Sequence, residues 1–206
     1  MMRSRFTSDL DSIKEMSQKI NELIIISYDR IDLYLDKGNK ENLEQVIDLY
    51  EDIRRAANDL ERLCFELLAL QQPVAKDLRF IQMEIKLAST QKRIASHLVS
   101  AAEILQNFAI SEKESSFIKA FISNQKTMAA DGIDAFVSYD KDKARKIMDR
   151  DEINNKIFVD AISFAASENK SDRIGAVELA NKILLFKYFE RLGDRLARIS
   201  DLATRL

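Results

Sequence analysis

Turn-forming residues are scarce in this sequence. It contains one proline and four glycines among 206 residues. Because these two residue types mark most turns, the chain can change direction at only a few places. The scarcity predicts a few long helices and an all-α fold class.

Apolar residues recur at helical spacing through nearly the whole chain. Steps of three and four residues place them on one face of a helix. In the first segment this face comprises Leu10, Ile13, Ser17, Ile20, Ile24, Ser27, Ile31 and Tyr34. The pattern stops at the sequence DKGNKEN, where Gly38 can supply a left-handed C-terminal cap.

The same periodicity predicts six long helices. The first ends before Gly38, and Pro73 separates the second from the third because proline disfavours helical geometry at the residue before it. Ser171 or Asp172 can cap the N-terminus of the sixth helix, which runs to the end of the chain. The second to fifth helices are expected at about 41–70, 74–108, 116–138 and 141–167.

Three helices, a break and three further helices suggest an internal duplication. The segment STQKRIASHLVSAAEIL can be aligned with KYFERLGDRLARISDLA so that the apolar pattern is preserved. We therefore predict two three-helix-bundle repeats, residues 1–109 and 110–206. In this alignment Arg93 corresponds to Arg191, Ala95 to Gly193, His97 to Arg195 and Leu98 to Leu196.

One acidic pair is not explained by helix stability. Glu190 and Asp194 lie four residues apart and repel by about 0.2–0.5 kcal/mol. Gly193 between them costs about 1 kcal/mol relative to alanine in a helix. The first repeat has Lys92 and Ser96 at the corresponding positions, so the acids are optional for the helix. They suggest a function confined to the second repeat.

The charged residues and the single histidine limit the functions that the sequence supports. A net charge of −2 and a pI near 5.7 argue against a dedicated nucleic-acid binder. The basic clusters at 141–146 and 92–93 are interpreted as solvated helix faces. His97, the only histidine, lies near the apolar seam and is predicted to be a hydrogen-bonded core residue.

The cysteine content and the absence of long apolar runs indicate the compartment. A single cysteine, Cys64, excludes an intrachain disulfide, fits a reducing compartment and is expected to pack as a small core residue. No apolar run approaches the roughly 18 residues of a membrane span, and the first residues lack a signal peptide. We expect a cytoplasmic protein that meets the membrane only through partners.

Three segments resemble the PhoU family of phosphate-transport accessory and regulatory proteins. They are RFTSDLDSIKEMSQKI near the N-terminus, LLALQQPVAKDLRFI at 67–81, and ERLGD at 190–194. The resemblance covers essentially the whole chain and implies two three-helix repeats and a homodimer. It also implies metal binding through paired E/D-x-x-x-D motifs, one from the second and one from the third helix of each repeat.

The first repeat departs from that metal-binding pattern, whereas the second largely keeps it. Tyr50, Arg54, Lys92 and Ser96 occupy the first-repeat positions and cannot neutralise a hard metal ion. In the second repeat the resemblance implies a site formed by Asp151, Asn155, Glu190 and Asp194. Such oxygen ligands suit a divalent or ferric ion, with Mg, Mn, Fe or Zn as candidates.

An ordinary charge ladder is the alternative interpretation of these acids. Asp201 lies on the same face and is a weaker candidate for the metal site. The ladder would pair Glu190 with Lys187, Asp194 with Arg198, and Asp201 with Arg205.

The resemblance implies a negative regulator that acts by protein contact. Its partners would be the ATPase subunit of the phosphate ABC transporter and the sensor histidine kinase of the phosphate response. The sequence has no phosphate-cradling glycine loop, nucleophile elbow or zinc signature, which agrees with a protein that is not an enzyme. Two alternatives remain open: a helical adaptor without this role, and a metal-dependent hydrolase or oxidase.

Overall fold

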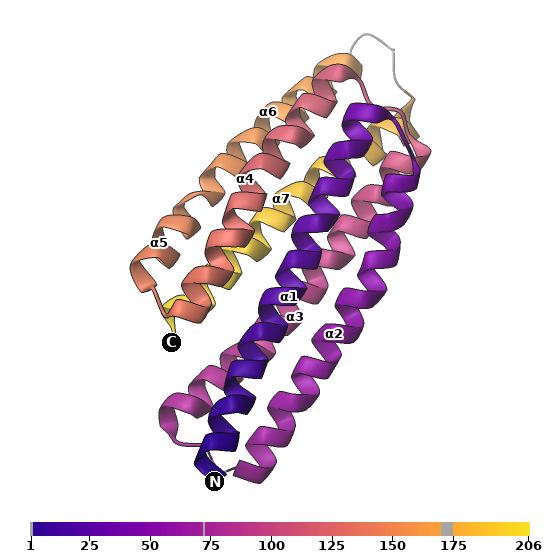
Figure 1. The fold of residues 1–206 in the computed structure, drawn as a ribbon. Coiled ribbons are helices and arrows are strands. Elements are labelled where there is room, and N and C mark those ends of the chain that lie inside the picture. Colours follow the sequence, from indigo (N-terminus) through magenta and orange to yellow (C-terminus); the bar gives the residue numbers. More distant parts are fainter. Residues whose placement is uncertain (1, 72, 170–174) are drawn as a thin grey trace.

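The computed structural model describes residues 2–71, 73–169 and 175–206, and these residues form an all-α protein (Figure 1). No strand occurs within these three ranges. Figure 1 shows two bundles side by side, one made of α1–α3 and the other of α4–α7. The predicted fold class is confirmed. The helices are α1 (Met2–Lys37), α2 (Glu41–Gln71), α3 (Ala75–Asn107), α4 (Glu112–Ser138), α5 (Lys141–Asp149), α6 (Asp151–Asn169) and α7 (Ala176–Thr204).

The end of α1 and the beginning of α4 show how local chemistry sets helix boundaries. Gly38 adopts φ 69° and its N–H donates to the Tyr34 carbonyl at 2.8 Å, which confirms the predicted cap. The prediction that the fourth helix begins near residue 116 is wrong, since α4 begins at Glu112. Ser111 accepts a hydrogen bond from the N–H of Glu114, whose carboxylate accepts from the Ser111 N–H at 2.7 Å. This is a capping box.

The predicted fifth helix is interrupted at Arg150 and consists of α5 and α6. The Arg150 N–H donates to the Ile147 carbonyl, and the Arg150 carbonyl accepts from the Ile153 N–H, both at 3.1 Å. The side chain of Asn124, from α4, also donates to that carbonyl at 3.2 Å. The break is therefore supported by a neighbouring helix. The predicted N-caps Ser171 and Asp172 lie outside the described residues.

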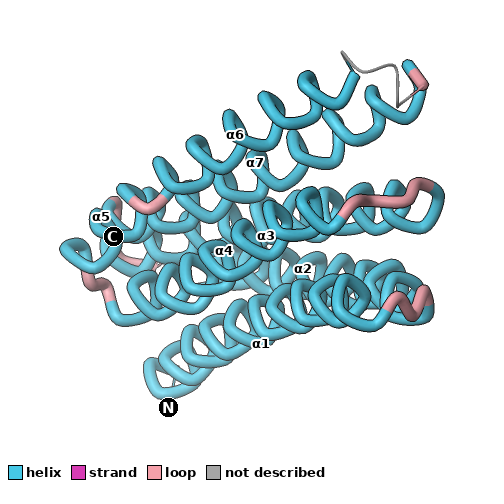
Figure 2. The backbone as a smooth tube through the Cα atoms, turned by 90° about the horizontal axis from the view of Figure 1, so that it is seen from above, coloured by secondary structure: helices cyan, strands magenta, loops and turns pink. Residues whose placement is uncertain are grey.

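The two repeats share one buried core. Helices α1 and α3 of the first repeat pack against α4 and α7 of the second, and the arrangement is visible from above in Figure 2. The central part of the predicted stripe in α1 is buried: Ile13, Ser17, Ile20, Ile24, Ser27 and Ile31. Within the described ranges, no helix is both long enough and apolar enough to cross a membrane.

Candidate functional site

Gly193 in α7 allows α6 to approach closely. A Cβ atom at this position would lie 2.3 Å from Asn154 Nδ2 and 2.6 Å from Asp151 Oδ1, well inside van der Waals contact. Any larger residue would therefore push the two helices apart. The glycine that costs stability within α7 is explained by the proximity of α6, and it places the N-terminus of α6 beside the ERLGD segment.

Three carboxylates surround this close approach. Burial raises the pKa of Asp151, and the charges of Asp194 and Glu190 raise it further, although a hydrogen bond from Asn154 acts in the opposite direction. The pKa of Asp194 is raised by burial and then by the charge of Glu190. The charges of Glu190 and Asp194 in α7 therefore act on Asp151 across the α6–α7 contact.

Glu190 is partly buried beside a lysine. Its side chain is 14% exposed, and Lys187 Nζ lies 2.7 Å from its Oε2 atom as an ion pair outside hydrogen-bonding geometry. The same ammonium group lies 5.1 Å from the centre of the Phe158 ring in α6. Lys187 thus balances the charge of Glu190 at the edge of the α6–α7 contact.

The amide that contacts these acids is Asn154, the neighbour of the predicted Asn155. Asn154 is fully buried and donates from Nδ2 to Asp151 Oδ1 at 3.0 Å. Asn155 is exposed and forms no hydrogen bond with another described residue through its side chain. The structure therefore brings Asp151, Glu190 and Asp194 together and leaves Asn155 in solvent.

The donor chemistry of these acids fits a hard cation. Carboxylate oxygens are the preferred ligands of Mg²⁺, Mn²⁺ and iron, and a cation would reverse the repulsion that raises the pKa of Asp151 and Asp194. In the described part of the chain, no three acidic, histidine or cysteine side chains already stand close enough to hold an ion. Metal binding would therefore require side-chain rearrangement, including the release of Glu190 from Lys187.

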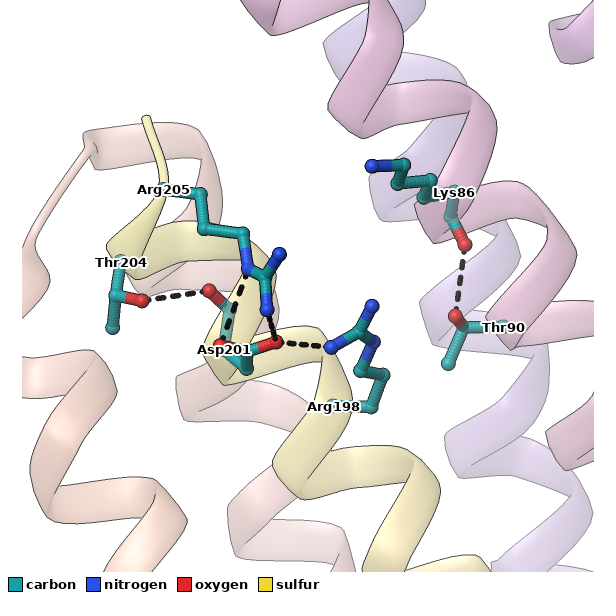
Figure 3. Close-up of polar contacts among 6 residues, drawn as sticks. All are labelled: Lys86, Thr90, Arg198, Asp201, Thr204 and Arg205. Atoms are coloured by element: carbon teal, nitrogen blue, oxygen red, sulfur yellow. Dashed lines mark hydrogen bonds and ion pairs between the residues drawn. The ribbon is translucent and has the colours of Figure 1, made fainter.

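The predicted charge ladder forms in part. Asp201 pairs with Arg198 and with Arg205, whose Nη2 atom lies 2.9 Å from Asp201 Oδ2 (Figure 3). The predicted Glu190–Lys187 pair is also present. The predicted Asp194–Arg198 pair is wrong, because Arg198 is committed to Asp201. Asp201 is therefore paired with two arginines and is not available to the candidate metal site. Asp194 forms no ion pair with another described residue.

The corresponding place in the first repeat is occupied by a salt bridge. Lys92 Nζ, from α3, lies 2.9 Å from Glu61 Oε2 and 3.1 Å from Asn58 Oδ1, both in α2. Arg54, another position at which the family resemblance implies a metal ligand, pairs with Glu51 on its own helix. An ammonium group thus joins the two helices that carry the metal motifs in the family pattern.

Cys64 and His97, the only cysteine and the only histidine in the sequence, differ in their burial. Cys64 is buried, and burial raises the pKa of its thiol to about 12, which agrees with its predicted role as a core residue. The prediction that His97 is a hydrogen-bonded core residue is wrong. His97 is partly exposed and forms no side-chain hydrogen bond within the described ranges. Its ring lies tilted against that of Tyr188, with ring centres 5.7 Å apart.

Comparisons with known proteins agree with the duplicated helical fold. The PhoU domain model matches the chain twice, over residues 13–105 and 121–203. The crystal structure of PhoU from Pseudomonas aeruginosa superposes with a TM-score of 0.88 at 20% identity, covering 96% of each chain. The phosphate transport system regulatory protein PhoU from Streptococcus pneumoniae gives a TM-score of 0.83 at 23% identity, covering 96% of this chain and 94% of that one.

Curated relatives match over nearly the full length. The phosphate-specific transport system accessory protein PhoU homolog 1 of Methanothermobacter thermautotrophicus is 29% identical, covering 98% of this chain and 91% of the relative. The PhoU homolog of Borreliella burgdorferi is 27% identical, covering 98% of this chain and 94% of the relative. Together with the two domain matches, these relatives show that the chain belongs to the PhoU family.

Proposed function

We propose that this protein is an accessory protein of a phosphate transport system that restrains phosphate uptake and the phosphate-starvation response. The observation that carries the proposal is the match of the PhoU domain model to both repeats. The curated relatives are named as phosphate-specific transport accessory proteins, and they match over nearly the whole length of the chain. The role rests on the complete duplicated architecture rather than on one motif.

The proposed mechanism is protein contact without chemical turnover. The partners are the ATPase subunit of the phosphate ABC transporter and the sensor histidine kinase of the phosphate response. The protein acts as a cytoplasmic homodimer that meets the membrane through these partners. The length of the helices supports such a role, because long helices present extended surfaces.

Deleting the gene is expected to raise the transcription of phosphate-response genes in phosphate-rich medium. The physical reason is the loss of the contact that holds the kinase and transporter in their restrained states. Reporter expression from a phosphate-response promoter measures the effect, and a plasmid copy of the gene should restore repression. Unchanged expression after deletion, with the reporter still responding to starvation, would contradict the proposed role.

A metal ion is the second part of the proposal. Asp151, Glu190 and Asp194 are the ligands that this chain offers, and the exposed Asn155 stands one residue beyond the buried amide. An ion bound to these carboxylates would supply positive charge between α6 and α7. It would thereby fix the separation of the two helices that Gly193 brings together.

The variant Glu190→Gln/Asp194→Asn is expected to lose bound metal. Both substitutions keep the side-chain size and remove the charge that attracts a cation. Metal content per chain is measured by mass spectrometry after purification without chelator and after addition of iron, manganese, magnesium or zinc. The matched control is Asp149→Asn/Asp160→Asn, which removes two charges from exposed positions. Equal metal content in all three proteins would contradict the assignment.

A further inference from the structure

A hollow between α3 and α7 is lined by three arginines together with a serine and a histidine. Its volume is about 290 Å³, and it opens to solvent. The lining residues are Arg93, Ser96 and His97 from α3 with Arg191 and Arg195 from α7. No acidic residue is among them, although acids outnumber bases in the chain as a whole. The interpretation of residues 92–93 as a solvated helix face is incomplete, because Arg93 meets Arg191 and Arg195 here.

The hollow lies where equivalent positions of the two repeats meet. In the alignment of the repeats, Arg93 corresponds to Arg191 and His97 to Arg195. These four residues therefore come from corresponding turns of α3 and α7, the last helices of the two repeats. The two helices pack against each other. At the first of these two positions both repeats have an arginine, Arg93 and Arg191. At the second position the first repeat has His97 and the second has Arg195. Only the complete two-repeat protein can assemble this set.

The three guanidinium groups have no anionic partner of their own. In the described ranges, none of them forms an ion pair with a carboxylate at 4 Å or less. The Nε atom of Arg195 is buried and has no hydrogen-bond partner there. A buried N–H group without a partner is destabilising, so a ligand that accepts a hydrogen bond from it gains affinity.

The field of all three arginines reaches His97. Burial lowers the pKa of His97, and the charges of Arg195, Arg191 and Arg93 lower it further. Arg191 and Arg195 also lower the pKa of Asp194, but burial and the charge of Glu190, also in α7, have larger effects and raise it. The hollow is therefore a place of concentrated positive charge, which disfavours protonation of the imidazole within it.

We propose that this hollow binds a phosphate group, either as free inorganic phosphate or as the phosphate of a small nucleotide. Guanidinium groups match the tetrahedral oxygens of phosphate with paired N–H donors, and three of them balance a charge near −2. The Ser96 hydroxyl adds a neutral donor. The volume of about 290 Å³ is just below the roughly 300–1,000 Å³ of small-molecule sites, which favours a small anion.

The test uses His97 as a reporter inside the hollow. It is the only histidine in the sequence, so the full chain prepared without a histidine tag gives one set of imidazole resonances. Inorganic phosphate, adenosine monophosphate and sodium chloride are added in parallel at constant ionic strength. Phosphate binding is expected to raise the pKa of His97, because a bound anion offsets the arginine charges. The shift should saturate with phosphate or with the nucleotide.

Two variants separate binding in the hollow from general charge effects. Arg191→Gln/Arg195→Gln is expected to weaken binding by about tenfold or more, since charge-assisted hydrogen bonds are lost. Arg93→Gln changes one exposed residue and serves as a second variant should the double variant unfold. Arg198→Gln, on the same helix but paired with Asp201, is the matched control and should bind as the wild type does.

Each outcome decides the inference. Saturation at a lower concentration of phosphate than of nucleotide identifies free phosphate as the ligand, and the reverse order identifies the nucleotide. No shift with either ligand, an equal shift with chloride, or unchanged binding in the arginine variants would overturn the proposal. The binding assay is independent of the gene-deletion reporter, so the failure of this site and the failure of the regulatory role are distinguishable.

Discussion

Replacing Lys182 by methionine is expected to lower the free energy of unfolding by about 3–5 kcal/mol. Lys182, in α7, is 6% exposed, and its ammonium group lies 3.1 Å from Glu114 Oε2. Glu114, near the start of α4, is 1% exposed. Methionine fills a similar volume but leaves the Glu114 carboxylate buried without its cation, and an uncompensated buried charge is among the costliest single changes.

Chemical denaturation at pH 7 measures this loss, and a double variant identifies its cause. Lys182→Met/Glu114→Gln removes both charges and should recover most of the lost stability. A glutamine carbonyl can still accept from the Ser111 N–H, so the capping box at the start of α4 is retained. Glu178→Gln is the control, because Glu178 is the exposed partner of Lys182 and its loss should cost less than about 1 kcal/mol.

The result also tests how the second repeat is held together. The Lys182–Glu114 pair joins the beginning of α4 to the beginning of α7, two helices that are far apart in sequence. If the double variant is as unstable as Lys182→Met, the loss comes from the packing of the lysine stem rather than from the charge, and the buried-charge account is wrong.

Most of the fold follows from local patterns. The step of three and four residues identifies the buried face of α1, and Gly38 marks its end, because both features act within one or two turns of helix. The start of α4 also has a local signal, because Ser111 and Glu114 have the spacing of a capping box within a polar stretch.

The interruption at Arg150 could not be predicted in the same way. The residues from 141 to 167 have good helical periodicity on both sides of it. What distinguishes Arg150 is the side chain of Asn124, which reaches its carbonyl from another helix. A break supported by a residue 26 positions away has no signal within a local window.

The candidate site also combines features that have a local signal in the sequence with features that depend on the packing of helices. Glu190 and Asp194 stand out because their spacing and the glycine between them are unfavourable for an isolated helix. The choice between Asn154 and Asn155 depends on the angle at which α6 meets α7, since residues three and four positions from Asp151 both lie on its side of the helix. The arginine hollow depends on the packing of α3 against α7 and has no local signal.

Replacing the buried Asn154 by alanine is expected to cost about 2–3 kcal/mol of stability. Its Oδ1 atom accepts from Asn124 Nδ2 at 3.0 Å and from Gln125 Nε2 at 3.4 Å, while its Nδ2 atom donates to Asp151. Removing the amide takes one partner from each of these groups, of which Asn124 and Gln125 are buried and Asp151 is half-buried. Thermal and chemical unfolding of the variant measure the change.

The exposed neighbour provides a matched control one residue away. Asn155→Ala makes the same chemical change on the same helix and is expected to alter stability by less than about 0.5 kcal/mol. Equal losses in the two variants would show that Asn155 also packs against the acids, in agreement with the family pattern and against this structure.

A large loss at Asn154 alone would mean that the polar core spans both repeats. Gln125, which Asn154 contacts, also donates to the Phe189 carbonyl in α7 at 2.6 Å and accepts from the Tyr28 hydroxyl in α1 at 3.0 Å. The network therefore runs from the first helix to the helix that carries Glu190 and Asp194. Because the members of such a network orient one another, a change at Asn154 should reach Asp151 directly and α1 through Gln125.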